Sequence, residues 1–207
     1  YWLNQDSQTF LSRGYIPEGV DPKLWFKLIA DKAERILNNP GFSDKFLGYL
    51  AKGYYLLPTP VITNYLTEKE SPISCFSSFA DDTIESILYN QAEIGTMSKI
   101  GGGTSVYLNK LRPRGAEISG GGETGGPVHF AELFQSVTNV VSQRSRRGKV
   151  VTWLDVEHQD IEEFLTIRDA GSPLQTISFG VCIGEEWLKS MKEGNPEKRS
   201  IWAKIVK

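Results

Sequence analysis

The residues best able to do chemistry in this chain are a thiol, a carboxylate, several arginines and an unusual density of glycine. Cys75 lies in a short segment that mixes small polar and bulky residues, and Asp82 follows it closely. Nine glycines lie between residues 101 and 126, with Arg112 among them. Glycine loses more conformational entropy on folding than any other residue, so this density needs a physical reason. Tight turns with positive φ would supply one, and so would close approach of bare backbone to a bound oxyanion.

The sequence suggests different roles for the two cysteines. Cys75, on a predicted strand, can act as a reductant or form a transient disulfide, or it can be a buried small apolar residue. Cys182 has apolar neighbours on both sides and is expected to be structural. Neither cysteine has metal-ligand spacing to His129 or His158, which are expected to be ordinary surface or capping residues. Two cysteines form no disulfide framework, so a reducing, cytoplasmic compartment is expected.

The charged residues near the glycines also permit more than one role. A guanidinium binds oxyanions bidentately, so Arg112 and Arg114 suit a phosphate, although surface ion pairs would use them equally well. Asp82 can contact a nucleotide or simply cap the helix that begins beside it. The basic segment 143–148 is typical of a solvated patch, an RNA contact or a loop that closes over a nucleotide.

Composition narrows the class of protein. The chain has 207 residues, of which 40% are hydrophobic, and a formal net charge of −2. Such a balance provides no global field for nucleic acid or an anionic membrane. Since no apolar run approaches the roughly 20 residues that span a bilayer, no membrane partner is expected. Residues 199–207 stop in the middle of an amphipathic pattern, so the chain is expected to be one piece of a longer protein.

Periodicity and turn residues predict a helical N-terminal region, 1–53, followed by an α/β region, 54–207. Extended backbone is expected over residues 54–60, where prolines bound an apolar run. From residue 54 onward strand and helix signals alternate, which is typical of α/β proteins. The predicted helices are 7–13, 22–37, 42–52, 82–99, 128–142, 160–168 and 185–194, and the predicted strands are 73–79, 150–154 and 175–183.

The order of these motifs resembles the catalytic, or large, subunit of ribonucleotide reductase, most closely the aerobic class I type. The similarity covers nearly the whole chain. The segments that carry it are Pro58-Thr59-Pro60, 72–76, Asp82 with 85–87, 101–105, 111–115, 118–122, 126–130, 141–143, 146–148 and 157–165. The resemblance implies a helical N-terminal part followed by the first half of a ten-stranded α/β barrel.

The resemblance also implies roles for individual residues. Cys75 matches one member of the cysteine pair that reduces the 2′ position of a ribonucleoside diphosphate. The implied substrate-binding residues are Thr59, Ser74 and Gly103. The implied residues of the allosteric specificity site are Asp82, Thr83, Ile84, Arg112 and Ser119, with a first loop over 110–122. A second loop, 143–148, would couple effector to substrate through Gln143 and either Arg146 or Arg147.

Several departures and partners follow from the same resemblance. Ser119 stands where many relatives have a second phosphate-binding arginine, and Arg114 is a candidate substitute. The ATP-binding cone and the radical-bearing cysteine of the family have no counterpart in this sequence. The expected partners are the C-terminal remainder of the large subunit, a radical-generating small subunit, thioredoxin or glutaredoxin, and a second copy bound through helices 83–99 and 128–142.

No cofactor is expected to bind this chain directly. A deoxynucleoside triphosphate or ATP with Mg²⁺ is expected at the specificity site, and the metal or radical cofactor on the small subunit. Two other functions remain open. One is a non-catalytic module for nucleotide binding and dimerisation, and the other is RNA binding through Arg144, Arg146 and Arg147, with salt-dependent affinity.

Overall fold

The computed structural model describes residues 3–67, 71–143 and 146–207, and for 142, 143, 146 and 147 it describes the backbone alone. The chain forms two compact units, Tyr1–Ser74 and Cys75–Lys207. The sequence placed the boundary after Gly53 instead. The difference arises because apolar residues of the segment 54–66 pack into the core of the N-terminal unit; they include Tyr55, Leu57, Val61, Ile62, Tyr65 and Leu66.

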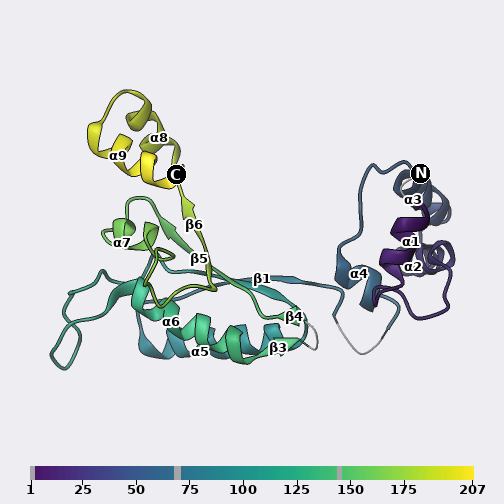
Figure 1. Ribbon diagram of the computed structural model, residues 1–207, viewed down its shortest axis with the longest axis horizontal. Coiled ribbons are helices and arrows are strands. Elements are labelled where there is room, and N and C mark those ends of the chain that lie inside the picture. The colour runs from purple at the N-terminus through teal and green to yellow at the C-terminus, as the bar shows by residue number, and fades with distance from the viewer. Residues whose placement is uncertain (1–2, 68–70, 144–145) are drawn as a thin grey trace. The chain divides into compact units, whose positions relative to one another are not determined.

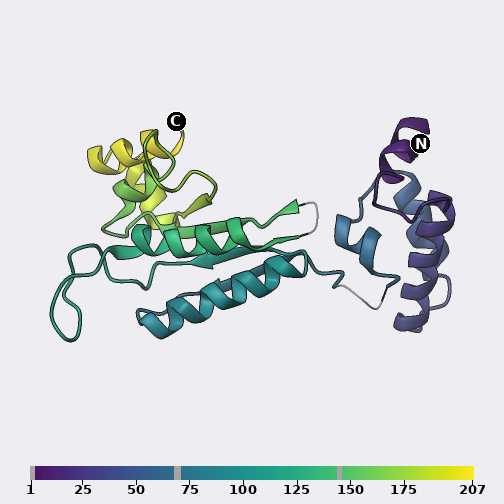
Figure 2. The same cartoon turned by 60° about the horizontal axis from the view of Figure 1, so that its bottom comes forward.

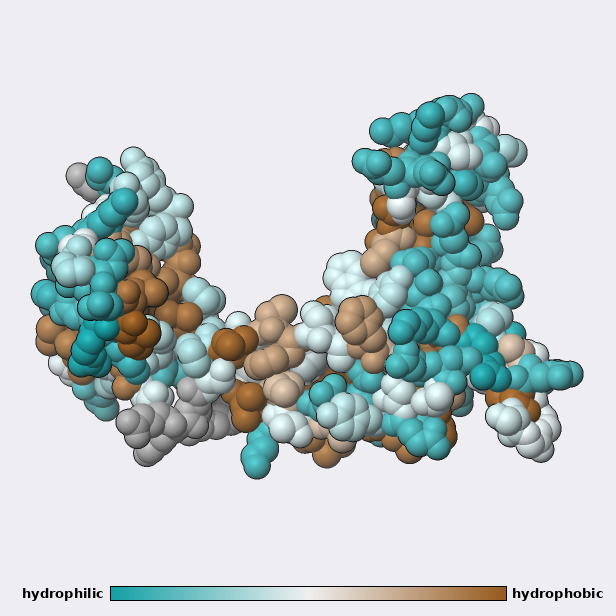
Figure 3. Space-filling model, turned by 180° about the vertical axis from the view of Figure 1, so that it is seen from behind, coloured by the Kyte–Doolittle hydropathy of each residue, from teal (hydrophilic) through white to brown (hydrophobic). Residues whose placement is uncertain are grey.

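The N-terminal unit is helical, with α1 (Gln5–Leu11), α2 (Pro22–Leu37), α3 (Phe42–Ala51) and α4 (Thr59–Asn64) (Figure 1). Its buried core contains Leu11, Ile16, Phe26, Ile29 and Leu50. The bounds of α2 match the sequence prediction, because Asp21 caps the helix and Pro22 occupies its first turn. Apolar side chains also reach the surface of this unit, as the brown areas in Figure 3 show. Its exposed large aliphatic residues include Leu24, Ile36 and Leu56.

Helix α4 is a feature that the sequence prediction missed. Extended backbone was expected through Pro60, but the helix begins at Thr59. Proline is tolerated in the first turn of a helix, where its missing N–H has no intrahelical partner to bond. The indole N–H of Trp25 donates to the carbonyl of Ile62 at 2.7 Å, which ties α4 to α2.

The C-terminal unit is built on four parallel strands in the order β1 (Cys75–Phe79), β2 (Gly103–Tyr107), β5 (Val150–Asp155) and β6 (Ser178–Cys182). Parallel neighbours need crossover connections, which α5 (Ile84–Lys99) and α6 (Gly126–Val140) provide. These two helices lie side by side along the sheet (Figures 1 and 2). Helix α7 (Ile161–Leu165) follows β5. The predicted α/β fold with a helical N-terminal part is therefore confirmed.

One face of the sheet is buried and the other is open. Val106, Val150 and Leu154 are fully or almost fully buried with Ile94 of α5 and Phe134 of α6. Burial alternates along β1. Cys75, Ser77 and Phe79 are exposed, whereas Phe76 and Ser78 are partly buried. Because successive strand residues point to opposite faces, the exposed set shares the open face.

Strand β2 was also missed by the sequence prediction, which treated residues 101–126 as one glycine-rich segment. The strand pairs in parallel with β1 on one side and with β5 on the other, so it is central to the sheet. Its buried residues are Thr104 and Val106, which alternate with positions of the open face. Because residues 101–103 are all glycine, the alternation of apolar and polar residues that marks a strand is too short here to be recognised in the sequence.

The remaining elements are short. Strands β3 (Ser142–Gln143) and β4 (Arg146–Arg147) form an antiparallel ladder within the predicted basic loop. The chain continues through α8 (Glu185–Lys192) and α9 (Pro196–Ile205). Among the described residues, no helix is both long enough and apolar enough to cross a bilayer.

Candidate functional site

Cys75 opens strand β1 and its thiol is exposed. Of the two expectations for this residue, the described structure thus favours an accessible cysteine over a buried one. Cys75 is in register with Gly103 of β2, the neighbouring strand. Further along the open face the hydroxyl of Ser105 donates to that of Ser77 at 2.9 Å. A thiol, a bare backbone position and two hydroxyls thus share the open face of β1 and β2.

The glycines before β2 have specific structural reasons. Gly101 has a φ of +103° in the turn that follows α5, a conformation that favours glycine. A Cβ on Gly102 would clash with the ring of Phe76. These two residues are therefore needed for a tight turn and for packing, whereas Gly103 lies on the strand that carries the open face.

The other two predicted substrate residues belong to the N-terminal unit. Thr59 begins α4, and its carbonyl accepts a hydrogen bond from the Thr63 hydroxyl at 3.0 Å. Ser74 is partly buried and directly precedes Cys75 in the chain. Of the four residues predicted at the substrate site, Cys75 and Gly103 are brought together within one unit.

Asp82 and Arg112, both predicted at the effector site, contact each other directly. Arg112 Nε lies 2.6 Å from Asp82 Oδ2, and the Arg112 backbone N–H donates to Asp82 Oδ1 at 3.1 Å. Arg112 Nη1 also donates to the carbonyl of Glu117 at 2.6 Å. About a third of each side chain of the ion pair is exposed, so an anion from solvent can reach the guanidinium. Next to it, Lys110 and Asp81 form a second, more exposed pair.

The residue that caps α5 is Thr83, not Asp82. The Thr83 hydroxyl accepts a hydrogen bond from the backbone N–H of Ser86 at 3.1 Å, which satisfies one free donor of the helix terminus. The Asp82 carboxylate is left for Arg112. Ile84 is the first residue of α5, and half of its surface is exposed. Three predicted effector residues therefore lie consecutively where β1 leads into α5.

Residues 115–124, which we call the glycine hairpin, lie between Arg112 and α6. Glu117 and Glu123 pair in an antiparallel bridge, and the backbone N–H of Ile118 donates to the carbonyl of Gly122. Ser119 is exposed at the tip, next to three glycines with positive φ: Gly120, Gly121 and Gly122. The chain reverses sharply at the tip, and this turn is the structural reason for three glycines despite the conformational entropy that they lose on folding.

Arg114, the candidate substitute for a second phosphate ligand, is engaged elsewhere. Its guanidinium binds the carboxylate of Glu163 through Nε at 2.9 Å and Nη2 at 2.5 Å. The bond to Glu163 raises the pKa of Arg114. A phosphate bound by Arg114 would have to displace Glu163 from this bidentate pair. Neither Glu163 nor its neighbours Asp160 and His158 carry a motif that predicts a function from the sequence.

The second predicted loop is tied to the two long helices. Gln143 is in register with Arg146 in the ladder of β3 and β4. The side chains of residues 142–147 and the backbone of 144–145 lie outside the described part of the chain. A Cβ on Gly148 would lie 2.9 Å from Ser98 Oγ of α5 and from the Thr138 carbonyl of α6. Only glycine fits this close packing. The contact between residue 148 and the two helices is not predictable from the periodicity of the sequence.

A polar cluster lies at the carboxyl ends of β2, β5 and β6. The Tyr107 hydroxyl donates to Asp155 Oδ2 at 2.7 Å, and Asp155 is in register with Cys182. Burial and then this hydrogen bond raise the pKa of Tyr107 to about 12. Burial, followed by the charge of Asp155, raises the pKa of Cys182. The Cys182 thiol therefore stays protonated near neutral pH, which agrees with its expected structural role.

Within the described part of the chain, no group of three or more His, Cys, Asp or Glu side chains is placed to hold a metal ion. The functional groups at hand are the Cys75 thiol, the Asp82–Arg112 pair and the backbone of the glycine hairpin. Such a set suits redox chemistry at sulfur and recognition of an anion.

Comparison with known proteins agrees with this arrangement. The family described as ribonucleotide reductase, barrel domain, matches residues 73–201. The chain is 32% identical over 145 residues to the vitamin B12-dependent ribonucleoside-diphosphate reductase of Mycobacterium tuberculosis, covering 69% of this chain and 21% of that protein. It is 32% identical over 180 residues to the ribonucleoside-diphosphate reductase subunit alpha of Synechocystis sp., covering 81% of this chain and 24% of the relative.

A solved structure extends the similarity to nearly the whole chain. The Actinobacillus ureae class Id ribonucleotide reductase alpha subunit matches with a TM-score of 0.84 and 45% sequence identity, over 98% of this chain and 38% of that structure. The chain thus spans well under half the length of the relatives that it matches. It belongs to the ribonucleotide reductase family and contains part of the barrel domain of that family's large, or alpha, subunit.

Proposed function

We propose that this chain works as part of a ribonucleoside-diphosphate reductase, which converts ribonucleoside diphosphates to 2′-deoxyribonucleoside diphosphates. The observation that carries this proposal is the exposed Cys75 thiol at the start of β1, in register with Gly103. A reductant of this kind must be accessible both to substrate and to the dithiol that restores it.

In the proposed reaction two thiols supply two electrons and two protons. The 2′ C–O bond of the ribose breaks, the oxygen leaves as water, and the two sulfurs become joined in a disulfide. Cys75 would be one of these thiols. The second thiol, and a thiyl radical that removes the 3′ hydrogen for the duration of the turnover, would come from the sequence that completes the subunit. Thr59, Ser74 and Gly103 would contact the substrate.

A deoxynucleoside triphosphate or ATP would bind where β1 leads into α5. Arg112 would bind the phosphates, Asp82, Thr83 and Ile84 the nucleoside, and Ser119 would approach from the tip of the glycine hairpin. The chemistry of these groups suits such a ligand, since a partly exposed guanidinium is an oxyanion site. Mg²⁺ would arrive with the triphosphate oxygens. The phosphates would compete with Asp82 for Arg112, so effector binding would rearrange the ion pair.

Removing the Arg112 guanidinium should weaken effector binding. Because hydrogen bonds to charged groups contribute about 1.5–3 kcal/mol, Arg112→Ala should raise the dissociation constant for dTTP by about 10- to 100-fold. Equilibrium dialysis with labelled dTTP measures this change. Lys204→Ala is the matched control, because it removes one positive charge from an exposed ion pair with Glu162 on other helices. Equal affinities in all three proteins would contradict the assignment.

Signals would pass from effector to substrate through residues 143–148, with Gln143 and either Arg146 or Arg147 contacting substrate. This part of the proposal is supported by Gly148, whose close packing fixes the end of the loop against both long helices. A change in how α5 and α6 are arranged would therefore reach the loop directly.

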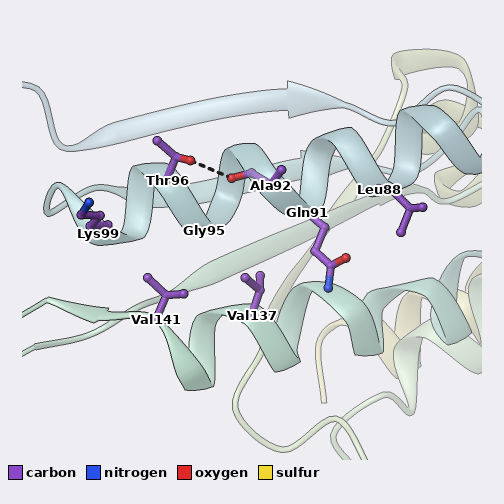
Figure 4. Close-up of a pocket in the computed structure, with 8 residues that line it drawn as sticks. All are labelled: Leu88, Gln91, Ala92, Gly95, Thr96, Lys99, Val137 and Val141. Atoms are coloured by element: carbon purple, nitrogen blue, oxygen red, sulfur yellow. Dashed lines mark hydrogen bonds between the residues drawn. The ribbon is translucent and has the colours of Figure 1, made fainter.

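The same two helices would form the interface of a homodimer. A groove of about 390 Å³ runs between α5 and α6 and is lined by Leu88, Gln91, Ala92, Gly95, Thr96, Lys99, Val137 and Val141 (Figure 4). On the same two helices Tyr89 and Val140 are exposed, Val140 to 82%. Exposed apolar side chains beside an apolar groove favour a protein partner, and a second copy of the chain would cover them symmetrically. Sedimentation as a monomer, with and without dTTP, would contradict the dimer.

The proposed reaction is tested by reconstitution. The chain, the remainder of its subunit and a radical-generating small subunit should together form deoxyribonucleoside diphosphate, with thioredoxin or glutaredoxin as reductant. Binding of dTTP without activity in any such reconstitution would instead indicate a non-catalytic nucleotide-binding and dimerisation module. Preferential, salt-dependent binding of RNA over dTTP would indicate the third alternative.

A further inference from the structure

The two ends of the glycine hairpin meet at one carboxylate. Arg114, just before the hairpin, donates its backbone N–H to Asp160 Oδ2 at 2.9 Å. Just after the hairpin, a Cβ on Gly126 would lie 2.5 Å from the same oxygen and 2.7 Å from the Arg114 nitrogen. Gly126 also has a φ of +74°, which favours glycine. The carboxylate of Asp160 therefore lies directly against both ends of the hairpin.

Asp160 does not use this carboxylate to cap its own helix. It occupies the N-cap position of α7, where an aspartate side chain normally accepts a hydrogen bond from the second or third residue of the helix. Here the side chain makes no such bond. The stability that a cap would add to α7 is forgone, and the carboxylate is directed to the backbone of Arg114 instead.

A second contact from the same short helix reinforces the first. Glu163 lies three residues beyond Asp160, so both side chains can face the same neighbour. Its carboxylate holds the Arg114 guanidinium through two hydrogen bonds, at 2.9 and 2.5 Å. Since both groups are substantially exposed, this pair contributes little to overall stability. Its two-point geometry nevertheless defines the direction of the Arg114 side chain.

His158 connects the same region to the segment between β2 and the hairpin. The backbone N–H of Asp160 donates to His158 Nδ1 at 3.0 Å, so this nitrogen carries no proton. Nε2 therefore carries the proton of the neutral ring and donates to the carbonyl of Leu111 at 2.9 Å. Residues 158–163 thus contact the chain at Leu111, Arg114 and Gly126.

We propose that Asp160, supported by His158 and Glu163, is a positioning residue of the effector site. The inference rests on the proposed effector site and adds a residue to it that touches no nucleotide. Asp160 holds the two ends of the segment 114–126, which carries Ser119 and begins two residues after Arg112, while the glycine tip adapts to the bound nucleoside triphosphate. Fixed ends reduce the number of conformations that binding must remove, and this raises effector affinity.

The test compares Asp160→Ala and Asp160→Asn in the complete protein, with dTTP as the probe. Asp160→Ala should bind dTTP about tenfold more weakly, within the usual range of coupling between sites. Asp160→Asn keeps an oxygen that accepts from the Arg114 N–H, so it should recover most of the affinity. Glu162→Ala, at a neighbouring exposed position that pairs with Lys204, should bind as the unmodified protein does.

A second measurement separates positioning from general damage. The ratio of kcat/KM for two ribonucleoside diphosphates should respond less to dTTP in Asp160→Ala, whereas a merely structural defect would lower both values together. If Asp160→Ala does not fold, Glu163→Gln weakens the neighbouring contact at an exposed site and should show the same trend. Unmodified protein that fails to bind dTTP would overturn the proposed effector site itself. Binding by the unmodified protein with unchanged affinity in Asp160→Ala, or in Glu163→Gln where the former does not fold, would overturn this inference alone.

Discussion

Replacing Cys75 by serine should abolish repeated formation of deoxyribonucleoside diphosphate in the reconstituted enzyme. A hydroxyl cannot form the disulfide that supplies two electrons per turnover, so only the reaction's background would remain. We expect a loss of about 10³-fold or more in kcat, as when a reacting group is removed from other active sites. Binding of dTTP should be unchanged, because the effector residues lie beyond the opposite end of β1.

The control for this experiment is Cys182→Ser. Cys182 ends strand β6, and burial together with Asp155 raises the pKa of its thiol, so the thiolate is scarce near neutral pH. Because it has no part in the proposed reaction, its replacement should leave turnover close to that of the unmodified enzyme. Undiminished multiple turnover by Cys75→Ser with a dithiol reductant would remove Cys75 from the proposed mechanism.

Replacing Phe164 by alanine should cause the largest loss of stability among single changes near the site. Phe164 of α7 is fully buried, and its ring meets that of Phe179 on β6 edge to face, with centroids 5.5 Å apart. Truncating a buried phenylalanine typically costs about 3–5 kcal/mol, because apolar contacts are lost and a cavity remains. Since α7 carries Glu163 and begins at Asp160, the same change should also weaken effector binding.

Urea unfolding of the matched variants measures this effect. Phe164→Leu should lose less stability than Phe164→Ala, because leucine refills much of the cavity. Phe79→Ala is the exposed control: Phe79 is 67% exposed and its ring is perpendicular to that of Tyr107, so a loss of about 1 kcal/mol or less is expected. Similar losses for Phe79→Ala and Phe164→Ala would show that α7 is not anchored by this ring.

The sequence by itself determined the fold class, the family and the residues able to do chemistry. Local signals were sufficient for α2, because Asp21 and Pro22 specify how a helix begins whatever surrounds it. The order of short motifs along the chain was sufficient for the family, because that order does not depend on contacts. The partial burial of Cys182 was also predicted, since apolar residues flank it on a strand, whereas the sequence left the exposure of Cys75 open.

Only the tertiary structure decided which of these residues meet. Asp82 was a possible helix cap until its carboxylate was seen to bind Arg112, thirty positions away in sequence. The partner of Arg114 was not predicted, and it is Glu163, 49 positions away in sequence. Strand β2 was hidden because glycine obscures the alternation that marks a strand, and pairing with β1 and β5 determines it instead. Each of these features depends on partners distant in sequence, which periodicity and local propensity do not encode.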